Sequence, residues 1–208
     1  MPLIRKSDKD TRTPDTNPAD VLSSLTSGNQ EQRWTAARAA ARIPGGMEAL
    51  AAALHSETDA RVREAMFTSL ARIGSPASVT AIIPLLRVDD ANLRTGALDA
   101  LRAMPDAVRE SLPILLGDSD GDVRILSCEI VRGLPGDEAT SILSALLAHE
   151  ADVNVCAAAI DVLAEVGGAA ALPALDSCAA RFPDTLFLTF AIRIARDRIL
   201  SQSMESNG

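Results

Sequence analysis

The sequence repeats one helical pattern at intervals of about thirty residues, and this periodicity limits the possible folds more than any other feature. The clearest copy spans residues 59–74. Asp59 is a good N-cap because its carboxylate accepts hydrogen bonds from the first helical turn, and Gly74 follows where a positive φ is often required. A lone helix of this length is marginal in water, so its apolar stripe must pack against other segments. The stripe consists of Val62, Ala65, Met66, Ser69, Leu70 and Ile73.

Each copy of the pattern follows a shorter amphipathic segment, so the repeating unit is a helical hairpin. The last apolar residue of the pattern recurs at Ile43, Ile73, Met104, Leu134 and Val166. One hairpin cannot bury both of its faces, and units of this period stack on one another. The predicted hairpins span residues 18–46, 47–76, 77–106, 107–137, 138–169 and 170–202.

The motif Asp-x-x-Val-Arg, followed in the same helix by Leu-x-x-Ile-Gly, resembles the second helix of the HEAT repeat, in the short form found in phycobiliprotein lyases. Pro84 and Pro113 resemble the proline that bends the first helix of such repeats. The resemblance covers residues 18–202 and implies an all-α fold, a right-handed α-α superhelical solenoid of about six HEAT-like helical hairpins. Residues 1–17, which show no periodicity, and residues 203–208 are expected to be disordered tails.

Charge and composition argue against several classes of function. The formal net charge of −8 opposes binding to nucleic acids or to an acidic membrane surface. No apolar run approaches the roughly 20 residues that a bilayer span requires, and no signal peptide is visible. The three cysteines, Cys128, Cys156 and Cys178, fall within helical patterns and indicate reduced thiols in a cytoplasmic protein. The preference for Arg over Lys is typical of a GC-rich bacterial genome.

Residues that could bind metals or catalyse reactions occur without the required spacing. The pair His149-Glu150 invites comparison with deoxyhypusine hydroxylase, a HEAT-like enzyme whose His-Glu iron ligands begin second helices, whereas His149 ends a first helix. The cysteines have no C-x-x-C spacing. HEAT-like DNA glycosylases need a basic face with aromatic residues, but Trp34 is the only Trp here. We therefore predict no catalytic residue, no metal and no cofactor.

The outward positions of the second helices are the candidates for partner binding, because the family resemblance implies that these helices line the concave side. These positions combine acidic and basic groups with Trp34 and Ile125, which we expect to be exposed anchors. Such a groove suits a helix or loop with basic and apolar side chains. Two i,i+3 pairs in the set have an alternative role, stabilising their own helices. The candidates are Trp34, Arg38, Glu64, Asp99, Arg102, Ile125, Glu129, Arg132 and Asp161.

The sequence thus predicts a cytoplasmic, non-enzymatic scaffold, adaptor or regulatory subunit that binds a partner protein. The alternative is a subunit of a phycobiliprotein-lyase-like enzyme that attaches or removes a chromophore, which rests on the repeat resemblance. A bilin carries propionates and a long conjugated system, so its site needs arginines and aromatic side chains. Only the arginines are abundant in this sequence. The identity of the partner and the oligomeric state are left open.

Overall fold

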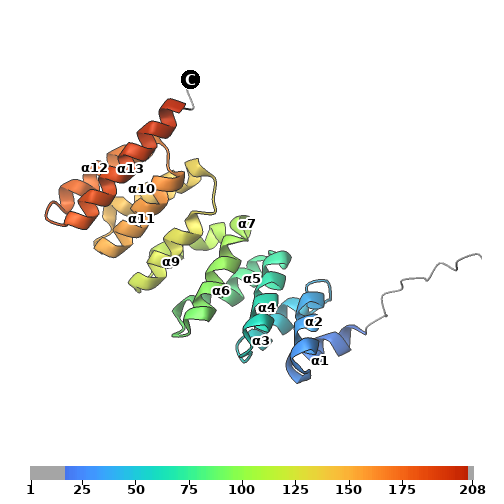
Figure 1. Cartoon of the computed structure of the whole chain (residues 1–208). Coiled ribbons are helices and arrows are strands. Elements are labelled where there is room, and N and C mark those ends of the chain that lie inside the picture. Colours follow the sequence, from blue (N-terminus) through green and yellow to red (C-terminus); the bar gives the residue numbers. More distant parts are fainter. Residues whose placement is uncertain (1–16, 206–208) are drawn as a thin grey trace, which may run out of the picture.

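The computed structural model describes residues 17–205, and all regular secondary structure in that range is helical (Figure 1). Six hairpins follow one another along this part of the chain, each with a first-helix segment and a second helix. The second helices are α2 (Gln30–Ala40), α4 (Ala60–Ile73), α6 (Ala91–Arg102), α9 (Gly121–Val131), α11 (Val153–Val166) and α13 (Leu186–Glu205). The first-helix segments are α1 (Pro18–Ser27); α3 (Gly46–Leu54); α5 (Pro76–Ile82) with the 3-10 helix η1 (Ile83–Arg87); α7 (Pro105–Val108) with η2 (Arg109–Ser111) and α8 (Leu112–Leu116); α10 (Gly136–His149); and η3 (Ala169–Ala171) with α12 (Leu172–Arg181).

The second helices pack side by side in chain order and form one layer, and the first-helix segments form the layer behind it (Figure 1). A single apolar core runs between the layers from Val21 to Ile199. Its most buried members include Leu50 and Leu70 from the second repeat and Leu101 from the third. The predicted all-α, right-handed solenoid of HEAT-like hairpins is confirmed, and α1 and α13 lie at its opposite ends.

Aspartates cap four of the second helices, including the cap predicted at Asp59. Asp59 accepts a hydrogen bond from the Val62 N–H at 3.0 Å, and Gly74 ends the same helix with φ of 60°. The same capping by an aspartate recurs at three further second helices, at Asp90, Asp120 and Asp152. These caps satisfy N–H groups that have no partner within the helix.

The arginine of the motif binds four of the second helices to the loop before them. Arg63 Nε donates to the Glu57 carbonyl at 2.6 Å, and three other motif arginines donate to a carbonyl five or six residues upstream. Cys156, which replaces the arginine in the fifth repeat, contacts the Glu150 carbonyl in the same way, with Sγ 3.6 Å from the oxygen. The other three arginines are Arg33, Arg94 and Arg124.

The boundaries differ from the expectations in a few places. The first-helix segments around Pro84 and Pro113 are broken by 3-10 turns, as proline lacks the N–H that a regular helix needs. Helix α13 runs to Glu205, three residues past the predicted end of the solenoid at 202. Residues 1–16 of the predicted N-terminal tail lie outside the described residues. Between residues 17 and 205, no helix combines the length and apolar character of a membrane span.

Candidate functional site

All nine predicted binding residues belong to the second-helix layer, but they fall into groups with different surroundings. Trp34 and Arg38 come from α2, Glu64 from α4, and Asp99 and Arg102 from α6. Ile125 and Glu129 come from α9, Arg132 follows its last residue, and Asp161 comes from α11. Their order along the face follows the order of the repeats, so they form an extended strip and not one compact site.

Trp34 is not the exposed anchor that the sequence suggested. Its ring is half-buried against the core, and the guanidinium carbons of Arg38 and Arg61 lie 4.5 and 4.4 Å from the ring centroid. Arg61, which comes from α4, also forms an ion pair with Glu31 at 3.2 Å. Ile125 is likewise half-buried against the core. Trp34 therefore helps to hold the first two repeats together through its cation–π contact with Arg61.

Arg132 is the centre of an ion-pair cluster that joins α9 to α11. Its guanidinium binds both Glu129 oxygens at 2.9 Å and Asp161 at 2.8 Å, and it also pairs with Glu165. The hydrogen bonds with Glu129, opposed by burial and aided by Asp161, raise the pKa of Arg132 above its usual value. The Arg132 side chain is 13% exposed. The predicted i,i+3 pairing is therefore formed here, and it neutralises charges that a partner was expected to meet.

The equivalent pair on α6 is not formed. Among the described residues, Asp99 and Arg102 have no ion pair with each other or with any other residue. Glu64 on the neighbouring helix α4 is also exposed and without an ion pair in that range. These carboxylates border a hollow of about 520 Å³ between α4 and α6. We call it the α4–α6 hollow; it is lined by Ala60, Arg63, Glu64, Phe67, Thr68, Ala71, Asn92, Gly96, Asp99, Ala100 and Ala103.

The apolar part of the α4–α6 hollow depends on a glycine. A Cβ at position 96 would lie 2.5 Å from Cε2 of Phe67, so only glycine lets the Phe67 ring pack against α6. Phe67 is 6% exposed, and its ring packs against α6 of the next repeat. The hollow therefore presents an aromatic and alanine-lined wall between two free carboxylates.

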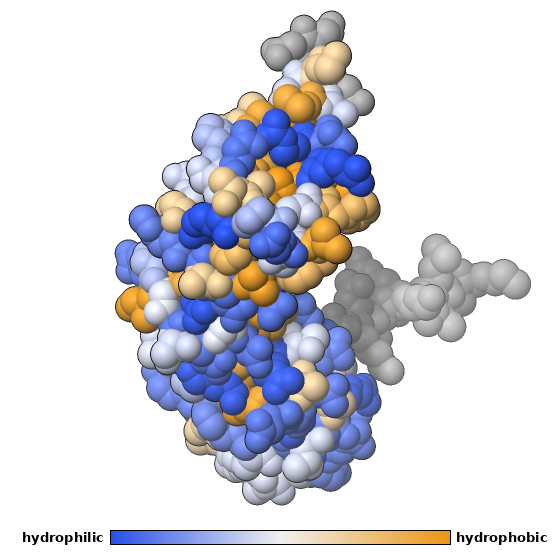
Figure 2. Space-filling model, turned by 90° about the vertical axis from the view of Figure 1, so that its left-hand side faces the viewer, coloured by the Kyte–Doolittle hydropathy of each residue, from blue (hydrophilic) through white to orange (hydrophobic). Residues whose placement is uncertain are grey.

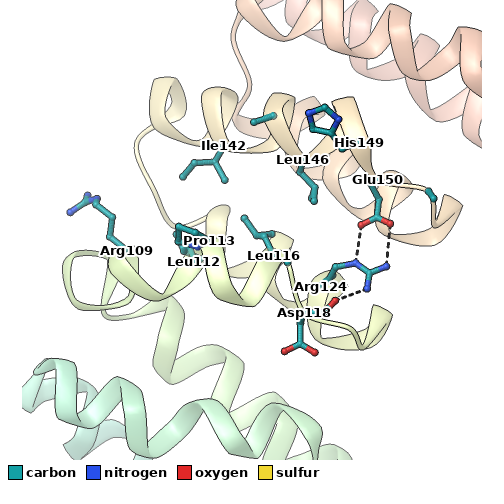
Figure 3. Close-up of a pocket in the computed structure, with 13 residues that line it drawn as sticks. Arg109, Leu112, Pro113, Leu116, Asp118, Arg124, Ile142, Leu146, His149 and Glu150 are labelled. Atoms are coloured by element: carbon teal, nitrogen blue, oxygen red, sulfur yellow. Dashed lines mark hydrogen bonds and ion pairs between the residues drawn. The ribbon is translucent and has the colours of Figure 1, made fainter.

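A second and larger hollow lies on the other layer, between α8 and α10, and the sequence did not predict it (Figure 3). Its volume is about 800 Å³, and its apolar wall includes Leu112 and Leu116 of α8 and Ile142 and Leu146 of α10. The first-helix segment of this repeat is interrupted before Leu112, so α8 has only five residues. The one sequence signal for this α8–α10 pocket is Pro113, which accompanies the interruption.

The charged side chains around the α8–α10 pocket are already paired. Arg124 binds both carboxylate oxygens of Glu150, at 2.8 and 3.1 Å, and donates to the Asp118 carbonyl at 2.7 Å (Figure 3). Burial alone would raise the pKa of Glu150, but the hydrogen bonds from Arg124 and the Asp152 N–H bring it below its usual value. Arg109 is paired in the same way with Glu138 at 2.6 Å. The pocket can therefore make apolar contacts with a ligand, but its charged groups are already bound to one another.

The side chains that the sequence made conceivable as metal ligands or nucleophiles have different surroundings. Residues 17–205 contain no group of three or more His, Cys, Asp or Glu side chains that could hold a metal ion. Glu150 of the His149-Glu150 pair is bound to Arg124 instead. All three cysteines are buried, and burial, with nearby Glu129, raises the pKa of Cys128 to about 12. A thiol with a raised pKa is a poor nucleophile, but Cys178 differs, because its hydrogen bond with Cys156 and the nearby Arg181 lower its pKa to about 7.

Stacked helical hairpins with a continuous core define an α-solenoid repeat protein. The chain belongs to the HEAT-repeat family, since the family model for HEAT repeats matches residues 18–102 and 108–189. A search of curated proteins found no match.

Several solved structures share the fold at low sequence identity. An engineered protein is 20% identical, with a TM-score of 0.42 over 89% of this chain and 97% of its own. A designed armadillo repeat protein is 15% identical, with a TM-score of 0.38 over 88% of this chain and 99% of its own. The complex of CpcE and CpcF of phycocyanin lyase from Nostoc sp. PCC7120 is 17% identical, with a TM-score of 0.40 over 96% of this chain and 99% of that chain. These likenesses concern the fold alone.

Proposed function

We propose that this chain is a cytoplasmic, non-enzymatic scaffold or adaptor that binds a partner protein on its second-helix layer, with the α4–α6 hollow at the centre of the binding site. The HEAT-repeat fold suggests a protein-interaction scaffold in general terms. The observation that carries the particular site is the pair of unpaired carboxylates, Glu64 and Asp99, beside an apolar wall. Unpaired exposed charges are available to a partner at little cost in lost internal contacts.

The other parts of the predicted strip are less suited to charge-directed recognition. Glu129 and Asp161 are held by Arg132, so a basic partner would have to compete with an internal guanidinium. The α8–α10 pocket lies outside the strip, on the first-helix layer, and the charged side chains at its edge are also paired. The strip is therefore expected to recognise basic groups mainly at Glu64 and Asp99.

The partner that fits the α4–α6 hollow is a helix or loop that carries Lys or Arg next to a bulky apolar side chain. The basic groups would lie between Glu64 and Asp99, and the apolar group would contact Phe67 and the alanines around it. Opposite charges raise the association rate and exclude acidic competitors, while burial of the apolar group slows dissociation.

A displayed random-peptide selection on the full chain tests this proposal. Peptides enriched on the wild type are measured by fluorescence anisotropy against Glu64→Arg/Asp99→Arg. A matched control with the same charge change is Glu48→Arg/Glu110→Arg, at two exposed acids of the first-helix layer. We expect enriched peptides to combine basic and apolar residues, to lose about tenfold or more in affinity for the hollow variant, and to keep their affinity for the control.

Two results would remove the α4–α6 hollow as the binding site. One is enrichment of peptides that lack basic residues, and the other is equal affinity for the wild type and the hollow variant. The chromophore-lyase alternative has no residue-level observation in its favour. Titration of a bilin with the protein tests it separately, and an unchanged visible absorption spectrum removes it.

A further inference from the structure

Helix α13 carries a stripe of exposed apolar side chains on the face opposite the core. Leu188, Ile192, Ala195 and Ile199 are buried on the inner side. On the outer side the exposed fractions are large: Leu186 81%, Phe190 56%, Leu200 45% and Met204 78%. Since α13 is the last helix of the stack (Figure 1), no following repeat among the described residues covers this face. Figure 2 shows apolar patches among hydrophilic atoms just below the grey C-terminal residues at the top of the molecule.

The spacing of this stripe is that of a coiled-coil seam. Residues 186, 193 and 200 are seven apart, and so are residues 190, 197 and 204, each four positions after a member of the first set. These two sets occupy the d and a positions of a heptad repeat. The seam reads Leu186, Phe190, Arg193, Asp197, Leu200 and Met204, with two apolar residues on each side of a central charged pair.

The two central charges lie exposed on the seam, without ion pairs within residues 17–205. The guanidinium carbon of Arg193 lies 5.1 Å from the centroid of the Phe190 ring, which places the cation over the stripe itself. Asp197 follows one turn later. A partner helix is therefore expected to supply an acid opposite Arg193 and a base opposite Asp197.

We propose that the partner of this face is α13 of a second copy of the chain, packed antiparallel about a two-fold axis near Ala195. In this register Phe190 faces Leu200 of the second copy, and Leu186 faces its Met204. Arg193 faces Asp197 of the second copy, and the symmetry forms this ion pair twice. A parallel pairing would instead place Arg193 beside Arg193. The charge order along the seam thus selects an antiparallel homodimer.

Sedimentation velocity on the full chain over a range of concentrations tests the dimer. The wild type is expected to shift from monomer to dimer mass as concentration rises. Arg193→Asp and Asp197→Arg each place like charges in contact, and each is expected to raise the dissociation constant at least tenfold. The double variant Arg193→Asp/Asp197→Arg is expected to restore the dimer, because it re-forms both ion pairs with reversed polarity. Arg72→Asp, an exposed position on α4 with the same charge change, is the control and should leave dimerisation unchanged.

The register is tested by cross-linking. In Phe190→Cys/Leu200→Cys the two introduced thiols lie about 15 Å apart on one helix, too far for a disulfide within one copy. Oxidation is therefore expected to give a covalent dimer for this variant and not for Phe190→Cys alone.

Three outcomes would overturn the proposal. The first is a wild type that stays monomeric at all concentrations. The second is a dimer that forms equally well in both single charge-reversal variants. The third is a chain that dimerises only after deletion of residues 1–16, which would mean that this segment covers the outer face of α13. The Glu64→Arg/Asp99→Arg variant should still dimerise, because the α4–α6 hollow lies on other repeats. Failure of the dimer and failure of the partner-binding proposal are therefore distinguishable.

Discussion

Replacement of Arg124 by methionine is the sharpest test of the forces that hold adjacent repeats together. The substitution keeps much of the aliphatic volume but removes both hydrogen bonds to Glu150 and the one to the Asp118 carbonyl. The Glu150 side chain is 7% exposed and would retain the Asp152 N–H as a donor at 2.8 Å. The variant therefore contains a carboxylate that is nearly buried and no longer paired.

The expected loss is about 3 kcal/mol of unfolding free energy at pH 7. Breaking a buried ion pair from one side costs about 3–5 kcal/mol. The Arg124 side chain is 16% exposed, so water can partly solvate the remaining carboxylate and the lower end applies. The double variant Arg124→Met/Glu150→Leu leaves no buried charge and is expected to lose only about 1 kcal/mol, mainly because the Asp152 N–H loses its acceptor.

The loss of unfolding free energy in Arg124→Met is also expected to depend on pH. In the wild type the folded-state pKa of Glu150 lies below its usual value, so its contribution is present above about pH 4.5 and is lost as the pH falls through the lower folded-state value. In Arg124→Met, burial without the arginine raises that pKa. The stability difference between the two proteins should therefore shrink as the pH is lowered from 7 to about 3.5.

Urea unfolding at both pH values, followed by circular dichroism, measures these differences. Arg72→Met, at an exposed arginine of α4, is the control and should change stability by less than about 0.5 kcal/mol. A loss below about 1 kcal/mol for Arg124→Met, or a loss that does not depend on pH, would refute the argument from the buried carboxylate.

Three further substitutions probe individual contacts, each measured by urea unfolding. Trp34→Ala removes a half-buried ring with two stacked guanidinium groups and should cost about 2 kcal/mol; a change below about 0.5 kcal/mol would show that these contacts are not formed. Gly96→Ala should cost about 2 kcal/mol because its Cβ meets the Phe67 ring at 2.5 Å, and Phe67→Leu in the same chain should recover part of the loss; no such recovery would contradict the steric explanation. Gly74→Ala should cost about 1 kcal/mol because φ is 60°, and Gly74→Asn should cost less; equal costs for the two would argue against backbone strain.

Much of the fold was predictable because its signals are local. The aspartate caps, the glycine and proline breaks and the apolar stripe all act within one or two turns of helix, so they could be recognised without knowing the tertiary structure. The repeat then implied stacking, because no hairpin can cover its own stripe. The end of α13 at Glu205 was not predicted, because residues after 202 carry no comparable signal.

The candidate site was predictable only as a list of positions on one face. Asp99 with Arg102 and Glu129 with Arg132 have the same spacing in the sequence, yet only the second pair forms. The difference comes from the neighbouring helix, since α11 offers Arg132 the carboxylate of Asp161 and thereby holds the guanidinium in place. The α8–α10 pocket lies between first-helix segments of two different repeats, so a pattern within one segment could not place it.

The sequence by itself determined that the chain forms stacked helical hairpins and where most of the second helices begin. Only the tertiary structure decided that Trp34 is covered by arginines and that, within residues 17–205, Glu64 and Asp99 stay unpaired and the outer face of α13 is not covered. The physical reason is that capping and helical periodicity act within a segment, whereas the pairing of charges and the covering of apolar surface depend on side chains about thirty residues away in the chain.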